Sequence, residues 1–188
     1  MHETTRILME EHAQVRRMLK VIRSLCISVM QGGDVDQAEF ASIIDFIRRY
    51  ADSHHHGKEE KILFPVMVEK LGRIGETMVT HGMLVEHSLG RSHVHDLADA
   101  LEAFQKDPGP SNRLDILESA MGYARLLGLH VDKEDTVVYP LAERMLAPEL
   151  WLDIDHEVKV FDEQEEKLGV RTKYLSFLEA EERKWGLV

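Results

Sequence analysis

Histidine and glutamate residues recur in this chain as one pattern that occurs twice with the same spacing. In the first copy, Glu11-His12 is followed 43 residues later by His55, and then by Glu59 and Pro65. The second copy lies 75 residues further on and consists of Glu86, His87, His130, Glu134 and Pro140. Imidazole and carboxylate groups are common ligands of metal ions in proteins. Two matched sets of them in one chain predict a site for two metal ions.

The spacing within each copy suits ligands on helices. Residues four apart lie on one helix face, so the second histidine and the glutamate of each copy can point to a common position. The leading histidines, His12 and His87, add one imidazole each from two other helices, as in the di-metal carboxylate sites of helical bundles. Nitrogen and oxygen donors without thiolate suit iron or manganese better than structural zinc or copper(I). The candidate metal ligands are His12, His55, Glu59, His87, His130 and Glu134.

The number of ligands indicates what the site does. If both glutamates bridge the two metals and an oxo or hydroxo group bridges them as well, each octahedral metal keeps one open position. Such a site binds a small ligand, whereas a structural metal site has all its positions filled by protein groups.

The choice of ligands in the first copy has an alternative, because His56 and Glu60 have the same spacing as His55 and Glu59. The repeat favours His55, which precedes Pro65 by ten residues, as His130 precedes Pro140. The remaining histidines have no counterpart in the repeat, and we expect them to contact solvent or to support the ligands from behind. They are His2, His54, His56, His81, His93, His95 and His156.

Apolar spacing and turn residues predict an all-α fold, an antiparallel four-helix bundle with an internal two-helix duplication. The expected helices span about residues 3–30, 35–71, 75–105 and 112–145. Asp34 and either Ser111 or Asn112 are the expected N-caps of the second and fourth helices, and Pro65 and Pro140 should kink or break them. Residues 1–146 form the predicted bundle. Residues 147–188 form a C-terminal helical extension, with helices over about 149–168 and 171–185, that covers the bundle or mediates contact in a homo-oligomer.

Composition excludes several classes of protein. The 188 residues carry a net charge of −11, which disfavours nucleic-acid binding because phosphates would be repelled. The single cysteine, Cys26, cannot form an internal disulfide. The first residues lack the apolar run of a signal peptide, and no segment reaches transmembrane length. The sequence therefore predicts a cytoplasmic protein without membrane contact.

The segments Glu-Glu-His12, His55-His-Gly-Lys-Glu59-Glu-Lys-Ile-Leu-Phe-Pro65, Val-Glu-His87 and His130-Val-Asp-Lys-Glu134 resemble the hemerythrin-like (HHE cation-binding) family. The resemblance covers about residues 5–146. It implies a four-helix bundle with a non-heme di-iron centre, oxo- or hydroxo-bridged and also bridged by the two carboxylates. It carries the six candidate ligands over as iron ligands, and manganese or zinc can substitute for iron.

One position departs from the oxygen-carrying members of the family. They have a fifth histidine one turn before the third-helix ligand, where this chain has Met83, and a thioether is a poor ligand for iron. The chain is thus more similar to the members with four histidines and two glutamates, which include proteins linked to nitrosative stress. The resemblance implies a protein that binds or senses O2 or NO. The alternatives are an enzyme that acts on NO or hydrogen peroxide in nitrosative or oxidative stress, and a protein of iron handling.

Four further residues are candidates to act around the ligands. Tyr123 lies seven residues before His130 and Arg16 and Arg91 lie four residues after the leading histidines, while Met83 can line a path for a diatomic ligand. The plainer interpretation is that the tyrosine is a core residue and that the arginines extend to solvent.

Overall fold

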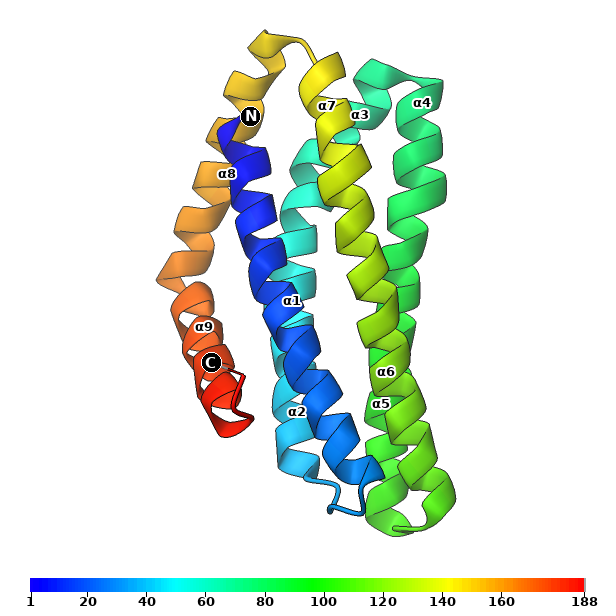
Figure 1. Cartoon of the computed structure of the whole chain (residues 1–188). Helices are drawn as coiled ribbons and strands as arrows, with labels where there is room; N and C mark the ends of the chain where they lie inside the picture. Colours follow the sequence, from blue (N-terminus) through cyan, green and yellow to red (C-terminus); the bar gives the residue numbers. More distant parts are fainter. Residues whose placement is uncertain (188) are drawn as a thin grey trace.

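The computed structural model describes residues 1–187, and its regular elements are all helical (Figure 1). The first half of the bundle contains α1 (Glu3–Met30), α2 (Gln37–Phe46), η1 (Ile47–His56), η2 (Glu59–Leu63) and α3 (Phe64–Leu71). The second half contains α4 (Arg73–Gly75), η3 (Glu76–Met83), α5 (Leu84–Lys106), α6 (Pro110–Lys133), η4 (Glu134–Val138) and α7 (Tyr139–Met145). Two more helices follow, α8 (Pro148–Lys167) and α9 (Val170–Lys184). The η elements are π-helical stretches within longer rods, and the predicted all-α class is confirmed.

The elements of the bundle join into four rods, which are α1, α2–α3, α4–α5 and α6–α7 with the η stretches between them. Figure 1 shows these rods running alternately down and up the molecule. α5 packs along α6, α1 packs along α6, and α2 packs on α5, so the two halves share one interior. The chain therefore brings its duplicated helix pairs face to face.

The two prolines of the repeat follow π-helical turns. η2 ends one residue before Phe64-Pro65, and η4 ends one residue before Tyr139-Pro140. A proline in an α-helix lacks one donor and collides with the preceding turn, and a wider turn before it relieves both problems. The α-helical pattern is therefore interrupted before both prolines, by widened turns that begin at Glu59 and Glu134.

The helix caps differ from the prediction in two places. Asp36, not Asp34, caps α2, and its side chain accepts a hydrogen bond from the Glu39 amide at 3.0 Å. α6 begins at Pro110, so Ser111 and Asn112 lie inside the helix and neither is its cap. Proline starts a helix well because its missing donor has no partner in the first turn.

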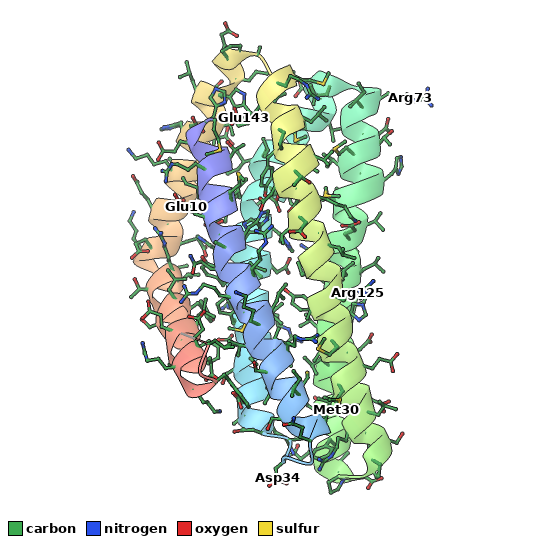
Figure 2. All side chains as sticks on the ribbon, in the orientation of Figure 1. Glu10, Met30, Asp34, Arg73, Arg125 and Glu143 are labelled. Atoms are coloured by element: carbon green, nitrogen blue, oxygen red, sulfur yellow. The ribbon has the colours of Figure 1, made fainter. Side chains whose placement is uncertain are left out.

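Two apolar clusters fill the bundle and leave a polar layer between them. The larger cluster includes Met18, Phe40 and Leu127, and the other includes Leu8, Phe64 and Met83. Charged side chains such as Glu10 and Arg125 point away from the bundle, as Figure 2 shows. The polar layer is thus enclosed by apolar side chains toward both ends of the bundle.

α8 and α9, here called the C-terminal arm, run one after the other along the outer side of α1 (Figure 1). Trp151 and Ile154 of α8 join the cluster around Leu8, and Tyr174 and Leu178 of α9 join the larger cluster. The arm also contacts η1 and η2, so it covers the first half of the bundle.

Candidate metal centre

The six histidine and glutamate side chains that the repeat singles out converge in the polar layer, each with an exposed fraction of 0–1%. His12 Nε2 and His130 Nε2 lie 3.1 and 3.2 Å from Glu134 Oε2. His87 Nε2 and His55 Nε2 lie 3.6 and 3.8 Å from Glu59 Oε2. Each glutamate thus faces one histidine of its own half and one of the other half, which is the arrangement that a bridging carboxylate needs.

Four polar atoms at this point have no hydrogen-bond partner although they are buried. They are His55 Nε2, Glu59 Oε2, and both carboxylate oxygens of Glu134. Buried polar groups are costly unless they are paired or bind a metal. Unpartnered nitrogen and oxygen atoms that face one another from the second and fourth rods, beside His12 and His87 of the other two rods, fit a site for metal ions.

Each of the four histidines is oriented by a carboxylate on its other ring nitrogen. His55 Nδ1 lies 2.9 Å from Glu11, and His130 Nδ1 lies 3.1 Å from Glu86. The leading histidines use the residue after each inward glutamate: His12 Nδ1 lies 2.7 Å from Asp135, and His87 Nδ1 lies 2.7 Å from Glu60. A carboxylate on Nδ1 leaves Nε2 free to bind a metal.

Arg16 and Arg91 hold two of these carboxylates in place. Arg16 donates to Asp135 and Asp132 at 2.8 Å each, and Arg91 donates to Glu60 at 2.7 Å. The arginines therefore lie near the ligands, but they act through carboxylates and do not face the centre itself.

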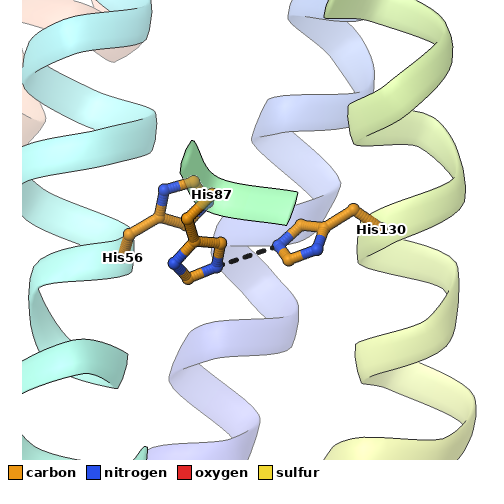
Figure 3. A group of neighbouring side chains, drawn as sticks. All are labelled: His56, His87 and His130. Atoms are coloured by element: carbon orange, nitrogen blue, oxygen red, sulfur yellow. Dashed lines mark hydrogen bonds between the residues drawn. The ribbon is translucent and has the colours of Figure 1, made fainter. Parts of the chain in front are cut away.

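In the first half, Glu59 points into the centre and Glu60 points outward to His87 Nδ1. The structure places both His55 and His56 inside, however, and His56 is only 5% exposed. Its ring stacks on that of His87 with 3.7 Å between centroids (Figure 3). His54 is buried too, but its Nε2 lies 3.0 Å from Glu11, behind His55.

The other histidines outside the repeat lie away from the centre. His2 is partly buried, lies 3.0 Å from Glu143 and stacks on Trp151. His81, His95 and His156 are exposed, and His93 is partly exposed.

Tyr139 is a site residue that the sequence analysis missed. Its hydroxyl donates to Glu59 Oε1 at 2.7 Å and lies 3.4 Å from His12 Nε2. The corresponding residue of the first copy, 75 positions earlier, is Phe64. Both residues are aromatic, and a comparison of the two copies at this position would have shown that only Tyr139 carries a hydroxyl.

Two other candidates lie near the centre without a polar contact to it among residues 1–187. Tyr123 lines a cavity of about 140 Å³ together with His56 and His87. Met83 is 5% exposed and packs in the apolar cluster with Leu8 and Phe64, on the side of the centre opposite to Tyr123.

The carboxylates attract positive charge into the polar layer. Burial alone would lower the pKa of His12, but Asp135 and Glu134 raise it to about 9. Burial would lower the pKa of His87 too, but Glu134, Glu60 and Glu59 raise it to about 10. Burial and the nearby Glu134 carboxylate raise the pKa of Glu59 well above its usual value. His12, His87 and Glu59 therefore favour their protonated forms beside the buried carboxylates, and bound cations can balance these carboxylates instead.

Comparisons with known proteins relate this chain to a cation-binding family. The family model for the hemerythrin HHE cation binding domain matches residues 3–142. Uncharacterized proteins of Mycobacterium tuberculosis and Mycobacterium bovis are 27% identical to this chain over 164 residues, which is 85% of the chain. The chain spans 60% of the length of these relatives. Within residues 1–187, none of the helices combines the length and apolar composition that crossing a bilayer requires.

Proposed function

Because this chain belongs to the hemerythrin HHE cation-binding family, we propose that it is a non-heme di-iron protein that binds a small diatomic ligand, O2 or NO, in a binding or sensing role. The observation that carries the proposal is the set of buried, unpartnered ligand atoms on His55, Glu59 and Glu134. Iron suits this set because all its donors are nitrogen or oxygen. The iron pair, when bound, supplies the redox chemistry that diatomic ligands require.

The distances support one assignment of ligands to the two ions. Glu59 and Glu134 each face a histidine of either half, so both would bridge. His12 and His55, whose rings lie 4.5 Å apart, would hold one ion. His87 and His130, whose Nε2 atoms lie 3.1 Å apart, would hold the other.

The enclosure of the centre supports a small ligand. Its histidines and glutamates are at most 1% exposed, and apolar clusters cover it on both sides along the bundle. This enclosure favours a diatomic molecule, which can pass between packed side chains, over an organic substrate, which would have to displace them.

Tyr139 favours one alternative, an enzyme that acts on NO or hydrogen peroxide in nitrosative or oxidative stress. Burial and the nearby glutamates raise the pKa of its phenol well above the usual value, so the hydroxyl keeps its proton at neutral pH. A protonated phenol 2.7 Å from Glu59 can donate a hydrogen bond or a proton to a ligand in the centre. Iron handling has less support, since a centre built from six ligands holds only two ions.

Anaerobic loading with iron(II), followed by exposure to O2 or NO in an optical cell, tests the proposal. We expect absorption bands that appear with the gas and disappear when it is removed under argon. Continuous consumption of NO or hydrogen peroxide, without a reversible bound form, would replace the binding role with the enzymatic one. Iron that remains unbound would overturn both.

A further inference from the structure

We propose that His56 is a fifth imidazole ligand of the centre and binds the metal ion that His87 and His130 hold. The inference rests on the proposed function, because it assumes two metal ions between the four rods. Nothing in the repeat predicts it, since the residue that corresponds to His56 in the second copy is Val131.

The ring nitrogens of three histidines lie close enough to bind one ion. His56, His87 and His130 each offer a nitrogen, and these nitrogens lie within 4.8 Å of one another. The three side chains come from three different rods and meet in the buried layer, as Figure 3 shows. The His56 ring is parallel to that of His87, with an interplanar angle of 12°, and nearly perpendicular to that of His130, at 88°.

His56 is oriented in the same way as the four histidines of the repeat. Its Nδ1 lies 3.2 Å from Asp52 Oδ1, and Asp52 is held in turn by Arg91 at 2.7 Å. A carboxylate on Nδ1 leaves Nε2 as the metal-binding atom. His54 shows the opposite orientation, because its Nε2 is taken up by Glu11. The orientation therefore separates His56, a ligand, from its neighbour His54.

The local backbone explains how adjacent histidines can both face inward. His55 and His56 lie at the end of η1, a π-helical stretch. Successive residues point about 100° apart in an α-helix, and the wider π turn reduces this angle. In the second half, His130 and Val131 lie in the α-helical part of the rod, and Val131 packs with Val15 and Ala51. The first half thus supplies three imidazoles, from His12, His55 and His56, and the second half supplies two, from His87 and His130.

A fifth imidazole makes the two metal positions unequal. The ion between His87 and His130 would be held by three imidazoles, and two bridging carboxylates and a bridging oxygen would fill its other positions. The ion between His12 and His55 would keep the open position. That position would lie on the side of Tyr139, whose hydroxyl is 3.4 Å from His12 Nε2. The inference therefore assigns ligand binding to one ion and a holding role to the other.

A cavity beside His56 provides a specific test. The cavity of about 140 Å³ is lined by His56 and His87 and by Asp52, Arg91 and Tyr123 around them. Replacing His56 with alanine would join this cavity to the centre. Free imidazole could then enter and occupy the position that the side chain has left.

The experiment is an anaerobic titration with cobalt(II), whose visible absorption strengthens as its coordination number falls. The proteins are the wild type, His56→Ala, and His54→Ala as the matched control, each shown to be folded by circular dichroism. We expect two ions in the wild type, affinity for the second ion lowered at least about tenfold in His56→Ala, and stronger absorption. Millimolar imidazole should reverse both changes in His56→Ala and should leave His54→Ala unchanged.

The outcomes distinguish this inference from the proposed function. Wild-type affinity and absorption in His56→Ala, with no response to imidazole, would overturn the role of His56 and leave the two-metal centre intact. A wild type that binds fewer than two ions would overturn the proposed function, and the inference with it. If His56→Ala does not fold, His56→Val, which copies the second half, is titrated instead with the same expected result.

Discussion

The two halves of the bundle build the same set of supporting contacts around the centre, here called the frame. Glu11 supports His55 in the first half as Glu86 supports His130 in the second. Lys58 and Lys133 bind the remaining oxygens of Glu11 and Glu86. The contacts that orient the ligands are therefore duplicated together with the ligands.

The halves differ in some of the side chains that lie beside the proposed metal positions. The first half has His56 and Phe64, whereas the second has Val131 and Tyr139 at the corresponding positions. In the proposed two-metal centre, the frame would set where the two ions bind, and these unmatched residues would give each ion its own surroundings. The C-terminal arm adds a further difference, because most of its contacts with the bundle are made to the first half.

The largest expected effect is a loss of metal when Glu59 or Glu134, which correspond to each other in the two halves, is replaced. Glu59→Ala and Glu134→Ala should each lose most of the second metal ion, because each carboxylate faces histidines of both positions. Metal content after desalting measures the loss. Glu60→Ala is the control, because Glu60 only supports His87 from behind, and it should lower affinity by about 10–100-fold. Full loading of both Glu59→Ala and Glu134→Ala with metal would show that these carboxylates do not hold the second ion.

Replacing Lys58 and replacing Lys133 should change the free energy of unfolding by different amounts, although the contacts of the two lysines correspond. Lys58 is fully buried between Glu11 and Asp162 of the arm, whereas the side chain of Lys133 is 48% exposed. Lys58→Met should lower the free energy of unfolding by ~3 kcal/mol, since it leaves buried carboxylates without their cation. Lys133→Met should change it by less than ~1 kcal/mol. Urea unfolding measures both, and equal losses would mean that the arm does not enclose Lys58.

Tyr139 and Tyr123 lie on either side of the centre, and removal of their hydroxyls should have different effects. Tyr139→Phe removes the hydrogen bond to Glu59 and should lower the free energy of unfolding of the metal-free protein by ~1 kcal/mol. It should also change the affinity for NO while both ions remain bound. Tyr123→Phe should change neither quantity, because Tyr123 makes no hydrogen bond to the ligands among residues 1–187. An effect of Tyr123→Phe on NO affinity would instead place the open position at the cavity.

The smallest expected effect is a pH dependence where the arm meets α2. Burial and the Glu39 carboxylate raise the pKa of Glu181 to about 7. An acid with a raised pKa binds its proton more tightly in the folded state, so its contribution to stability is present at low pH and is lost as the pH rises through about 7. Glu181→Gln should remove this part of the profile in urea unfolding between pH 5 and 8. An unchanged profile would show that Glu181 does not titrate in this range.

The sequence predicts the residues that the two halves share better than the residues in which the halves differ. His12, His55, Glu59 and their counterparts follow from spacing, because a repeat of helix pairs must place equivalent residues face to face. His56 could not be predicted in this way, since its inward direction depends on a π-helical stretch that spacing in an α-helix does not show. Tyr139 was missed because Tyr139 and Phe64 count as similar when copies are compared, although only one has a hydroxyl.

Helix ends were predicted less well for a related reason. Asp34 and Asp36 are both suitable caps, and the choice between them depends on how the loop after Gly33 reaches α2, where only Asp36 accepts the Glu39 amide. Local composition gives both candidates the same weight, and tertiary packing decides between them.

The most direct test of a two-metal centre is the iron content of the wild type and the magnetic coupling of the bound ions. The protein is loaded anaerobically with iron(II), desalted, oxidised with O2 and examined by Mössbauer spectroscopy at low temperature. Carboxylates shared by both halves predict two iron ions per chain that are coupled to each other through their bridges. One ion per chain, or two ions that remain magnetically independent, would contradict the account.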